Sequence, residues 1–209
     1  MDTRRIADLL APFAGDELLL PAQVEAFSAY LDLLLRWNQR VNLTAVRSPE
    51  QMVTRHFGES LFAARHLLSP GETAEVADLG SGAGFPGLPL RIMRPAARVT
   101  LIESQNKKAT FLKEVIRALG LCSVEVVTQR AEDLDRKFDL VAMRAVERFD
   151  RTLPVAVSLV KNGGRLGLLI GADQVARTQA LLPAFAWAQP VSIPQSTSRV
   201  LLAGRKPEC

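Results

Sequence analysis

The chain has 209 residues, of which 48% are hydrophobic and 23% charged, so it is long enough for one ordinary globular domain with a small extension. Its longest apolar runs fall far short of the roughly 18 residues that a membrane span needs, and its N-terminus lacks the apolar core of a secretion signal, so we expect a cytoplasmic protein with no membrane partner. With only two cysteines and two histidines, neither a disulfide framework nor a zinc site is expected, and no protein-bound catalytic metal.

The charge of the chain is mildly basic. Its formal net charge is +4, and 20 of its 26 basic residues are arginine. The planar guanidinium group of arginine binds phosphates and stacks on bases. A charge of this size is compatible with a merely solvated surface, but it also permits a nucleic-acid partner.

Residues 1–70 predict a helical extension. Apolar side chains recur at helical spacing within residues 6–13, 24–35 and 53–68. The sequence SPEQ at 48–51 resembles a capping box, in which a serine side chain caps the first turn of a helix. The segment SPGET at 69–73 is a plausible linker to the rest of the chain.

Residues 71–209 alternate between predicted strands and helices. The clearest helix covers residues 106–120 and ends at a glycine. The expected strands are AEVADLG, RVTLIES, VEVVTQ, FDLVAM, RLGLLI, PVSIP and SRVLLAG. This alternation predicts an α/β fold, with a doubly wound, mainly parallel, seven-stranded sheet over residues 71–209.

A glycine-rich loop, DLGSGAGFPG at 78–87, follows the first predicted strand and opens a helix. Glycine backbone and helix N-terminal amides can receive a ligand at this edge of a parallel sheet. Residues 82–87 fit the dinucleotide pattern G-x-G-x-x-G, whereas residues 78–84 fit the acid-x-G-x-G-x-G loop of class I methyltransferases. Both fits therefore predict a nucleotide-type cofactor at this loop.

Two acidic residues bear on which cofactor binds. Glu103 ends the second predicted strand, where its carboxylate can accept hydrogen bonds from both ribose hydroxyls of NAD or of S-adenosylmethionine. Asp78 precedes the loop, where it would repel a pyrophosphate but attract the sulfonium and ammonium groups of S-adenosylmethionine. The third strand ends near residues 131–133, whose polar groups would border an adenine.

Several catalytic devices are missing from the sequence. No Asn/Asp-Pro-Pro-aromatic motif follows the fourth strand, so the usual clamp for an exocyclic amino group is absent. Cys122 lies on the wrong side of the sheet for a nucleophile, and we expect a small buried filler there. A target that is already nucleophilic, such as guanine N7, needs alignment with the methyl donor rather than a strong base, and these absences permit that chemistry.

Six sequence blocks, spread over nearly the whole chain, resemble one family. They are WNQRVNLTAVR at 37–47, RHFGESL at 55–61, DLGSGAGFPGLPL at 78–90, LIESQNKKATFL at 101–112, QRAEDL at 129–134 and MRAV at 143–146. In this order they resemble the bacterial small-subunit ribosomal RNA guanine-N7 methyltransferases, long labelled glucose-inhibited division protein B. The resemblance implies a class I methyltransferase fold, S-adenosylmethionine as the donor and a guanine of the small-subunit (16S) RNA as the acceptor.

The resemblance also implies roles for individual residues. Gly80 and Phe85 should contact the cofactor from the loop, Glu103 should hold its ribose, and Ala131 and Glu132 should border its adenine. Arg144, after the fourth strand, should face the methionine end or the incoming RNA, and it is the one expected catalytic residue. With Asp78 and Gly82, these residues form the expected cofactor site.

The expected RNA contacts are basic residues of the extension and of the strand ends. They are Arg36, Arg40, Arg47, Arg55, Lys107, Lys108, Arg148 and Arg199. Lys107 and Lys108 lie at the positive end of a helix dipole, which makes an external anion a reasonable partner. Sequence-specific RNA recognition usually needs an unpaired base, so a loop or a partly assembled subunit is the expected substrate. We expect the protein to act as a monomer.

Three places depart from the pattern of that family. Gly58 and Glu59 stand where an aliphatic residue and an aspartate are common, and Ile170 stands where a lysine is common. Arg199 lies in a Ser-Arg-Val sequence where an Arg-His pair is frequent. These departures leave the expected cofactor site intact and concern the RNA contacts.

Two other functions remain open at this stage. One is an NAD-dependent oxidoreductase, which residues 82–87 and Glu103 would also suit. The other is a non-catalytic RNA-binding module that retains a vestigial cofactor pocket.

Overall fold

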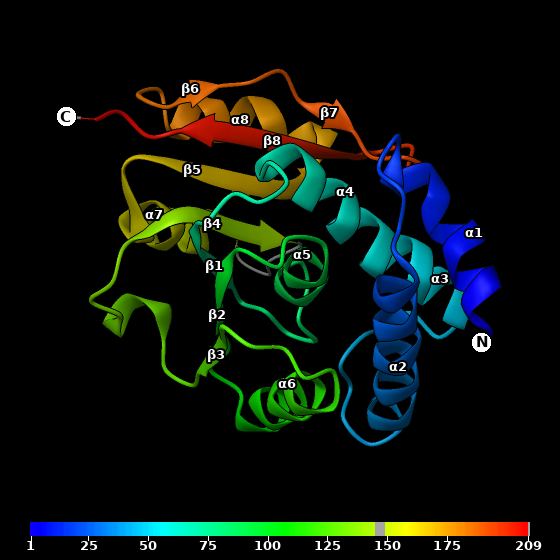
Figure 1. The fold of residues 1–209 in the computed structure, drawn as a ribbon. Helices are drawn as coiled ribbons and strands as arrows, with labels where there is room; N and C mark the ends of the chain where they lie inside the picture. The colour runs from blue at the N-terminus through cyan, green and yellow to red at the C-terminus, as the bar shows by residue number, and fades with distance from the viewer. Residues whose placement is uncertain (145–148, 209) are drawn as a thin grey trace.

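A computed structural model describes residues 1–144 and 149–208 (Figure 1). The helices are α1 (Thr3–Ala14), α2 (Pro21–Asn38), α3 (Pro49–Met52), α4 (Glu59–Leu67), α5 (Gly87–Met93), α6 (Asn106–Ala118), α7 (Phe149–Leu159) and α8 (Val175–Leu181). A π-helix, Val53–Gly58, joins α3 to α4, and short 3-10 turns cover Ala131–Asp133 and Ala172–Gln174. The strands are β1 (Glu75–Leu79), β2 (Arg98–Ile102), β3 (Val124–Val127), β4 (Phe138–Arg144), β5 (Val160–Gly171), β6 (Ala186–Trp187), β7 (Val191–Ser192) and β8 (Arg199–Arg205).

The strands form one mixed sheet in the order β3-β2-β1-β4-β5-β8-β6, with β7 also paired to β8. The strands β3, β2, β1, β4 and β5 are parallel to one another, whereas β8 runs antiparallel to β5. Both β6 and β7 pair with β8. These two short strands together take the outermost position, where the sequence predicts one strand, and the doubly wound, mainly parallel sheet is confirmed.

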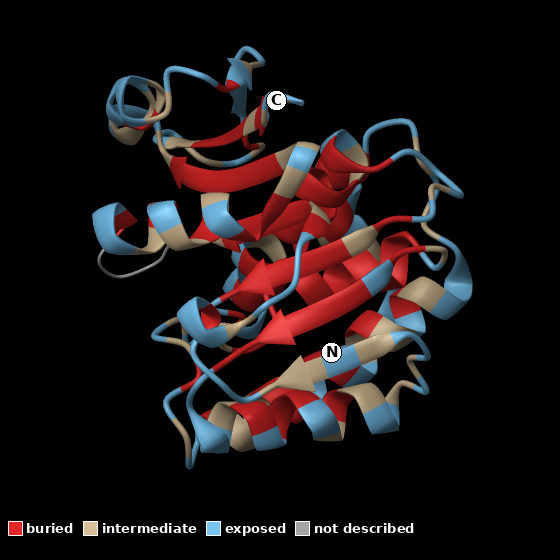
Figure 2. Cartoon of the chain, turned by 90° about the vertical axis from the view of Figure 1, so that its left-hand side faces the viewer, coloured by how far each residue is buried: buried red, intermediate tan, exposed pale blue. Residues whose placement is uncertain are grey.

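Alternating residues along the strands face two separate hydrophobic cores. On β1, Val76 belongs to the core under α2, α4, α5 and α6, whereas Ala77 belongs to the core under α7 and α8. On β8, Leu201 and Leu202 divide in the same way. This period of two explains why apolar residues predominate on both faces of the central strands, since both faces are covered. Figure 2 shows these strands as buried between helices whose outer surfaces are exposed.

The N-terminal helices are packed onto the sheet rather than standing apart from it. Ile6 of α1, Phe27 of α2 and Leu61 of α4 belong to the same core as Val76 of β1 and Leu101 of β2. In Figure 1 these helices, drawn in blue and cyan, form one side of the molecule. The predicted boundary near residue 70 therefore separates two segments that share one hydrophobic core.

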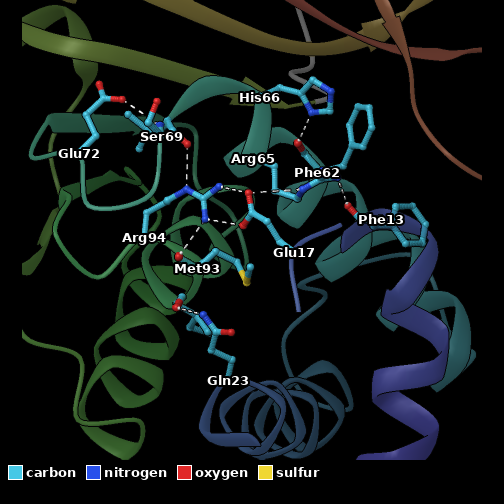
Figure 3. Close-up of polar contacts among 12 residues, drawn as sticks. Phe13, Glu17, Gln23, Phe62, Arg65, His66, Ser69, Glu72, Met93 and Arg94 are labelled. Carbon is cyan, nitrogen blue, oxygen red and sulfur yellow. Dashed lines mark hydrogen bonds and ion pairs between the residues drawn. The ribbon is translucent and has the colours of Figure 1, made fainter. Parts of the chain in front are cut away.

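A buried arginine ties the α1–α2 loop to the end of α5 (Figure 3). The side chain of Arg94 donates to both carboxylate oxygens of Glu17, at 2.7 and 2.8 Å, and to the carbonyl oxygen of Leu68 at 2.8 Å. Arg65 lies beside the same carboxylate, with its Nε 3.6 Å from Glu17 Oε1. The hydrogen bond from Arg94 is the main cause that lowers the pKa of Glu17. This network holds the extension against the sheet layer with a charged contact as well as an apolar one.

The side chain of Phe13 explains one departure from the family pattern. A Cβ atom built on Gly58 would lie 2.6 Å from Cδ2 of Phe13, which is much closer than two carbon atoms can approach. The ring of Phe13 thus fills the space that a side chain at position 58 would need. The other departures lie elsewhere: Ile170 is buried in the core under α7 and α8.

Two smaller expectations have opposite outcomes. The sequence favours Asn38 as a helix cap or a bridge between helices rather than a contact to a base. Its side chain accepts the amide N–H groups of Leu43 and Thr44 at 2.9 Å and closes the turn after α2. The prediction that Cys122 is buried is wrong, because its side chain is exposed. Cys122 precedes β3, an edge strand whose residues are partly buried or exposed, so the start of this strand lies at the surface.

Candidate active site

The expected site residues meet at the carboxyl edge of the parallel strands. Leu79 of β1 lies beside Ile102 of β2 and Met143 of β4 in the sheet register. The loop that follows β1, the residue after β2 and the last residue of β4 therefore lie at one edge. They include Gly80, Glu103 and Arg144, which the sequence places at three distant positions.

The glycines of the loop have two different environments. A Cβ atom on Gly80 would meet nothing within 4 Å, and one on Gly82 would meet only the carbonyl oxygen of Gly80 at 3.8 Å. By contrast, a Cβ atom on Gly84 would lie 2.5 Å from Tyr30 Oη, and one on Gly87 would lie 2.5 Å from Leu101 Cδ2. Gly80 and Gly82 therefore leave open backbone at the surface, whereas the space beside Gly84 and Gly87 is filled by the protein itself.

Glu103 is joined to that open backbone. Its Oε2 accepts the N–H of Gly82 at 2.9 Å, and its Oε1 accepts the N–H of Gln105 at 2.8 Å. The side chain is buried, and the amides fix both of its oxygens. A carboxylate oxygen has a further acceptor position, so the group can still bind a diol placed against Gly80 and Gly82.

Asp78 lies beneath the loop rather than on its open face. The residue is fully buried, its Oδ2 accepts the N–H of Gly87 at 2.9 Å, and its Oδ1 has no hydrogen-bond partner in the described part of the chain. Burial raises the pKa of its carboxyl to about 7, although the hydrogen bond from Gly87 opposes the shift. Asp78 can therefore act on a bound cation only through its charge, and a nearby cation would favour its ionised form.

Phe85 supports the site from below. Its ring is stacked on those of Tyr30 and His56, with centroids 5.6 and 4.9 Å apart, and it is also packed against Phe57. The guanidinium carbon of Arg144 lies 5.4 Å from the centroid of the same ring. The aromatic ring is therefore covered by protein, and only the backbone of Phe85 remains as a contact for a ligand in the loop.

Arg144, at the end of β4, is held by the N-terminal segment. Its Nη1 donates to the carbonyl oxygen of Arg55 at 2.9 Å, and its Nη2 donates to Nδ1 of His56 at 2.5 Å. Only 10% of its side chain is exposed. Burial lowers the pKa of Arg144 to about 10, while the nearby carboxylate of Glu59 opposes this shift. The guanidinium group is still charged at neutral pH.

The carboxylate of Glu59 lies close to two arginine side chains, Arg144 and Arg199. Its Oε2 is 2.7 Å from Nη2 of Arg199 and 3.9 Å from Nη1 of Arg144. The glutamate is buried, and burial raises the pKa of its carboxyl against the opposing effect of these arginines. The family departure at position 59 thus carries a carboxylate that joins α4 to both β4 and β8.

The sequence interpretation missed Glu59, His56 and Thr44 as site residues. His56 accepts from Arg144, and its other ring nitrogen, Nε2, is 2.7 Å from the hydroxyl oxygen of Thr44. Thr44 and His56 lie in sequence blocks that carry the family resemblance, but nothing in their spacing indicates contact with Arg144. The π-helix that contains His56 is an irregularity often found at functional sites, but it cannot be seen in the sequence.

The remaining cofactor residues lie after β3. Ala131 is buried at the start of the 3-10 turn Ala131–Asp133, and Glu132 is exposed in the same turn. The backbone N–H of Glu103 donates to the carbonyl oxygen of Val127 at 3.0 Å, so this turn follows a strand end next to Glu103. Their contact with an adenine stays a prediction.

The expected RNA contacts fall into separate groups. Arg55 and Arg199 join Arg144 around Glu59, whereas Arg36 and Arg40 line a groove of about 520 Å³ between the end of α2 and α6. Trp37 lines the same groove and packs edge-on against Phe111, 5.7 Å away. Three further expected RNA contacts lie elsewhere. Arg47 is exposed after α2, and Lys107 and Lys108 lie in the first turn of α6. Arg148 lies outside the described residues.

The geometry fits S-adenosylmethionine at the glycine loop. Open backbone at Gly80 and Gly82 adjoins the fixed carboxylate of Glu103, and a buried acid beneath the loop suits a cation rather than a pyrophosphate. Such a loop after the first strand of a sheet with this strand order defines a class I S-adenosylmethionine-dependent methyltransferase.

Solved structures share this fold. A ribosomal protein L11 methylase from Lactobacillus delbrueckii subsp. bulgaricus has a TM-score of 0.60 at 18% identity, over 73% of this chain and 79% of that one. TYW2 from M. jannaschii, solved in complex with AdoMet, has a TM-score of 0.59 at 18% identity, over 72% of this chain and 74% of that one.

The family is shown by sequence comparison. The family model described as "rRNA small subunit methyltransferase G" (GidB) matches residues 23–197, and the chain belongs to this family. A protein of that name from Desulfitobacterium hafniense is 45% identical over 148 residues, which cover 68% of this chain and 60% of the relative. Another from Roseiflexus castenholzii is 40% identical over 194 residues, or 86% of this chain and 82% of the relative.

Family membership settles the class of reaction. The chain is a methyltransferase, and S-adenosylmethionine is its methyl donor. The NAD-dependent oxidoreductase and the non-catalytic module are not favoured. No helix among the described residues is long and apolar enough to cross a membrane.

Proposed function

We propose that the protein transfers a methyl group from S-adenosylmethionine to N7 of a guanine in small-subunit (16S) ribosomal RNA. The family match supports the RNA class, since its members are described as methyltransferases of the small-subunit rRNA. The observation that carries the proposal is the meeting of open backbone at Gly80 and Gly82, the carboxylate of Glu103 and the guanidinium of Arg144 at one sheet edge.

We assign different residues to different parts of S-adenosylmethionine. Gly80 and Gly82 receive the cofactor against their backbone, together with the main chain of Phe85, and Glu103 accepts hydrogen bonds from the ribose hydroxyls. Ala131 and Glu132 border the adenine. The charge of Asp78 beneath the loop favours the cationic end. When bound, S-adenosylmethionine supplies an electrophilic methyl group on a sulfonium.

Methyl transfer to N7 does not require any residue to remove a proton from the target atom. N7 of guanine carries an exposed lone pair and no proton, so the protein needs to align the base rather than deprotonate it. His56 is the histidine of the site, and its pKa of about 3 leaves it neutral while Arg144 occupies one of its nitrogens. Arg144 has further N–H groups, which we assign to an oxygen of the target nucleotide. Exclusion of water and fixed orientation are then the main contributions of the protein.

We propose that the RNA lies across the basic residues around this edge. Arg36, Arg40, Arg47, Arg55 and Lys107 are exposed, and Lys108 and Arg199 are partly exposed. Arg148 completes the predicted set. The substrate is an unpaired guanine, because a base inside a duplex cannot be brought to a site at a sheet edge. The protein would act as a monomer in the cytoplasm, where ribosomal subunits assemble.

A methyl-transfer assay tests the reaction. With labelled S-adenosylmethionine, we expect label in small-subunit RNA, and mass spectrometry of the digested RNA should identify 7-methylguanosine. Glu103→Ala should raise the Kd for S-adenosylmethionine at least 10-fold, since it removes charge-assisted hydrogen bonds, while RNA binding is retained. Label on protein alone, or on another atom of the base, would contradict the proposal.

Salt-dependent binding tests the RNA surface. Replacing Arg36 and Arg40 by glutamine should weaken RNA binding and reduce the slope of log K against log salt by about 1 for each phosphate that the variant no longer neutralises. Arg98→Gln is the control for the loss of one charge, because Arg98 is exposed at the start of β2, on the opposite edge of the sheet. Equal decreases in binding free energy per charge removed would mean that Arg36 and Arg40 contribute only net charge.

A further inference from the structure

We infer that His56, oriented by Thr44, is a positioning residue that fixes the guanidinium of Arg144 for methyl transfer. The inference rests on the proposed function, because it assigns to His56 the task of orienting a residue that faces the RNA substrate. It concerns residues on three separate parts of the chain: the turn after α2, the π-helix and the end of β4.

The hydrogen bonds determine which nitrogen of His56 carries the proton. A guanidinium group is a donor only, so Nδ1 of His56, 2.5 Å from Nη2 of Arg144, must accept. A neutral imidazole then has its proton on Nε2. Nε2 lies 2.7 Å from Oγ1 of Thr44, which accepts that proton's hydrogen bond. The direction of every bond in the chain from Thr44 to Arg144 is thus fixed.

Thr44 is itself held in place. Its Oγ1 also accepts the N–H of Val46 at 3.1 Å, and its backbone N–H and carbonyl are bonded to the side chain of Asn38 at 2.9 and 3.0 Å. Asn38 is buried at the end of α2. The hydroxyl that orients His56 is therefore anchored to the longest helix of the N-terminal segment rather than to a loose loop.

The surroundings of His56 keep its ring neutral. The residue is buried, and the charged groups that act on it are the guanidinium groups of Arg144, Arg55 and Arg199. Burial and these cations lower its pKa to about 3. A histidinium in this position would have no lone pair for Arg144 and would repel it. His56 thus remains a hydrogen-bond acceptor for Arg144 at any pH at which the enzyme would be assayed.

The π-helix brings two acceptors to Arg144 at once. The carbonyl oxygen of Arg55 accepts from Nη1 and the next residue, His56, accepts from Nη2. The guanidinium carbon of Arg144 lies over the ring of Phe85. Two acceptors and one ring restrict both the position and the plane of the group, which leaves its remaining N–H groups with a fixed direction.

His66 provides an internal reference for the assigned tautomer. Its Nδ1 is 2.8 Å from the carbonyl oxygen of Phe62, which only accepts, so Nδ1 of His66 must carry a proton. The two histidines of the chain are therefore expected to be protonated on opposite nitrogens. In ¹⁵N NMR of the labelled protein at alkaline pH, His56 should show a protonated Nε2 and His66 a protonated Nδ1, with His66→Gln to assign the signals. A protonated Nδ1 on His56 would overturn the inference without any activity measurement.

Steady-state kinetics test the positioning role. His56→Leu removes the acceptor, and we expect kcat to fall at least 30-fold while the KM for S-adenosylmethionine changes less than 3-fold. His56→Asn places an amide oxygen near the position of Nδ1 and should recover at least a third of the wild-type kcat. Thr44→Val should lower kcat about 5-fold, and Thr44→Ser should restore it. Thermal unfolding of each variant separates these effects from a loss of folded protein.

Double variants with Arg144→Ala decide between positioning and packing. If His56 acts through Arg144, His56→Leu should have little further effect on kcat in the Arg144→Ala protein. An equal decrease in both backgrounds, or no recovery in a folded His56→Asn protein, would mean that His56 only packs against Phe85. If the wild-type protein shows no transfer to small-subunit RNA, the proposed function fails, and the positioning of Arg144 for that reaction fails with it. If transfer occurs and the His56 variants keep their kcat, the positioning role fails alone.

Discussion

The candidate site has two sides, the glycine-loop side around Gly80 and Gly82 and the arginine side around Arg144 and Glu59. The first side presents mainly backbone atoms, whereas the second presents charged side chains. On the loop side, Gly80 and Gly82 expose backbone, and the N–H of Gly82 holds the carboxylate of Glu103 beside it. On the arginine side, the chemistry lies in charged side chains that are largely buried, Arg144 and Glu59. The first side depends on local chain geometry, whereas the second depends on charge balance between distant elements. Substitutions should therefore affect them differently.

The largest effect is expected from Glu59→Gln on the arginine side. This change leaves Arg144 and Arg199 close together with no carboxylate between them, and it should lower the free energy of unfolding by about 3 to 5 kcal/mol, as for the loss of one partner of a buried ion pair. Urea unfolding at neutral pH measures it. Glu50→Gln is the control, since Glu50 forms an exposed ion pair with Arg5 that should contribute below about 1 kcal/mol. Similar decreases in both variants would contradict the assigned charge balance.

A pH-dependent effect of roughly 2 to 4 kcal/mol is expected from Asp78 beneath the loop. Its pKa is raised from 3.8 to about 7, so the folded protein holds a proton that the unfolded chain releases between these values. This carboxyl therefore makes stability fall as pH rises from about 4 to 7, with the full cost above pH 7. Asp78→Asn should flatten this part of the profile of unfolding free energy against pH.

Bound S-adenosylmethionine supplies a second readout for Asp78. Its cationic groups favour the ionised carboxyl, so the affinity of the wild-type protein for the cofactor should rise as pH increases from 6 to 8. Asp78→Asn should remove that rise. A stability profile and an affinity profile that are the same for wild type and variant would mean that Asp78 keeps its ordinary pKa.

A smaller effect, a loss of about 1 to 3 kcal/mol in stability, is expected from Gly87→Ala. The added methyl group would lie 2.5 Å from Leu101 Cδ2 and 2.7 Å from Asp78 Oδ2, so the core beneath the loop must shift. Chemical unfolding measures the loss. A variant as stable as the wild type would show that the packed half of the loop tolerates side chains as well as the open half does.

The smallest change in stability, about 1 kcal/mol, is expected from Gly80→Ala. Its φ of +70° strains an alanine, but the added methyl group meets no atom within 4 Å. Gly71→Ala is a close control, because Gly71 has a φ of +76° and the same open surroundings, far from the site. Both variants should lose similar stability, but only Gly80→Ala should weaken S-adenosylmethionine binding, by about 10-fold in calorimetry. Equal cofactor affinity in the two variants would exclude the open backbone at Gly80 as the cofactor surface.

The difference between the two sides also explains what the sequence could predict. The loop, Asp78 and Glu103 belong to continuous strand–turn segments, so their type and position follow from local pattern and strand order. His56 and Glu59 have no such pattern: they reach Arg144 only because the π-helix and the start of α4 lie beside the end of β4. A lone histidine or glutamate on an apolar helix is uninformative. The sequence also could not show that the ring of Phe85 is covered, since Tyr30 and Phe57 reach it from other helices.

Within the sheet, the same limit applies to the outer strands. The long strands β1, β2, β4 and β8 are predictable from apolar runs, which two-sided burial requires. The two-residue strand β6 is not, because Ala186 and Trp187 carry no alternating pattern and pair only with the end of β8. The exposure of Cys122 escapes prediction for a related reason, since an edge strand leaves its preceding turn without a cover.

Phe13 and Gly58 occupy one shared volume, although α1 and the π-helix are far apart in the chain. A chimera that took residues 55–61 from a relative with an aliphatic residue at position 58 would place that side chain where the ring of Phe13 already lies. A chimera that also took residues 1–15 would bring a residue 13 adapted to it. The first helix and the π-helix are thus coupled through this volume, and a side chain added at position 58 calls for a smaller residue at position 13.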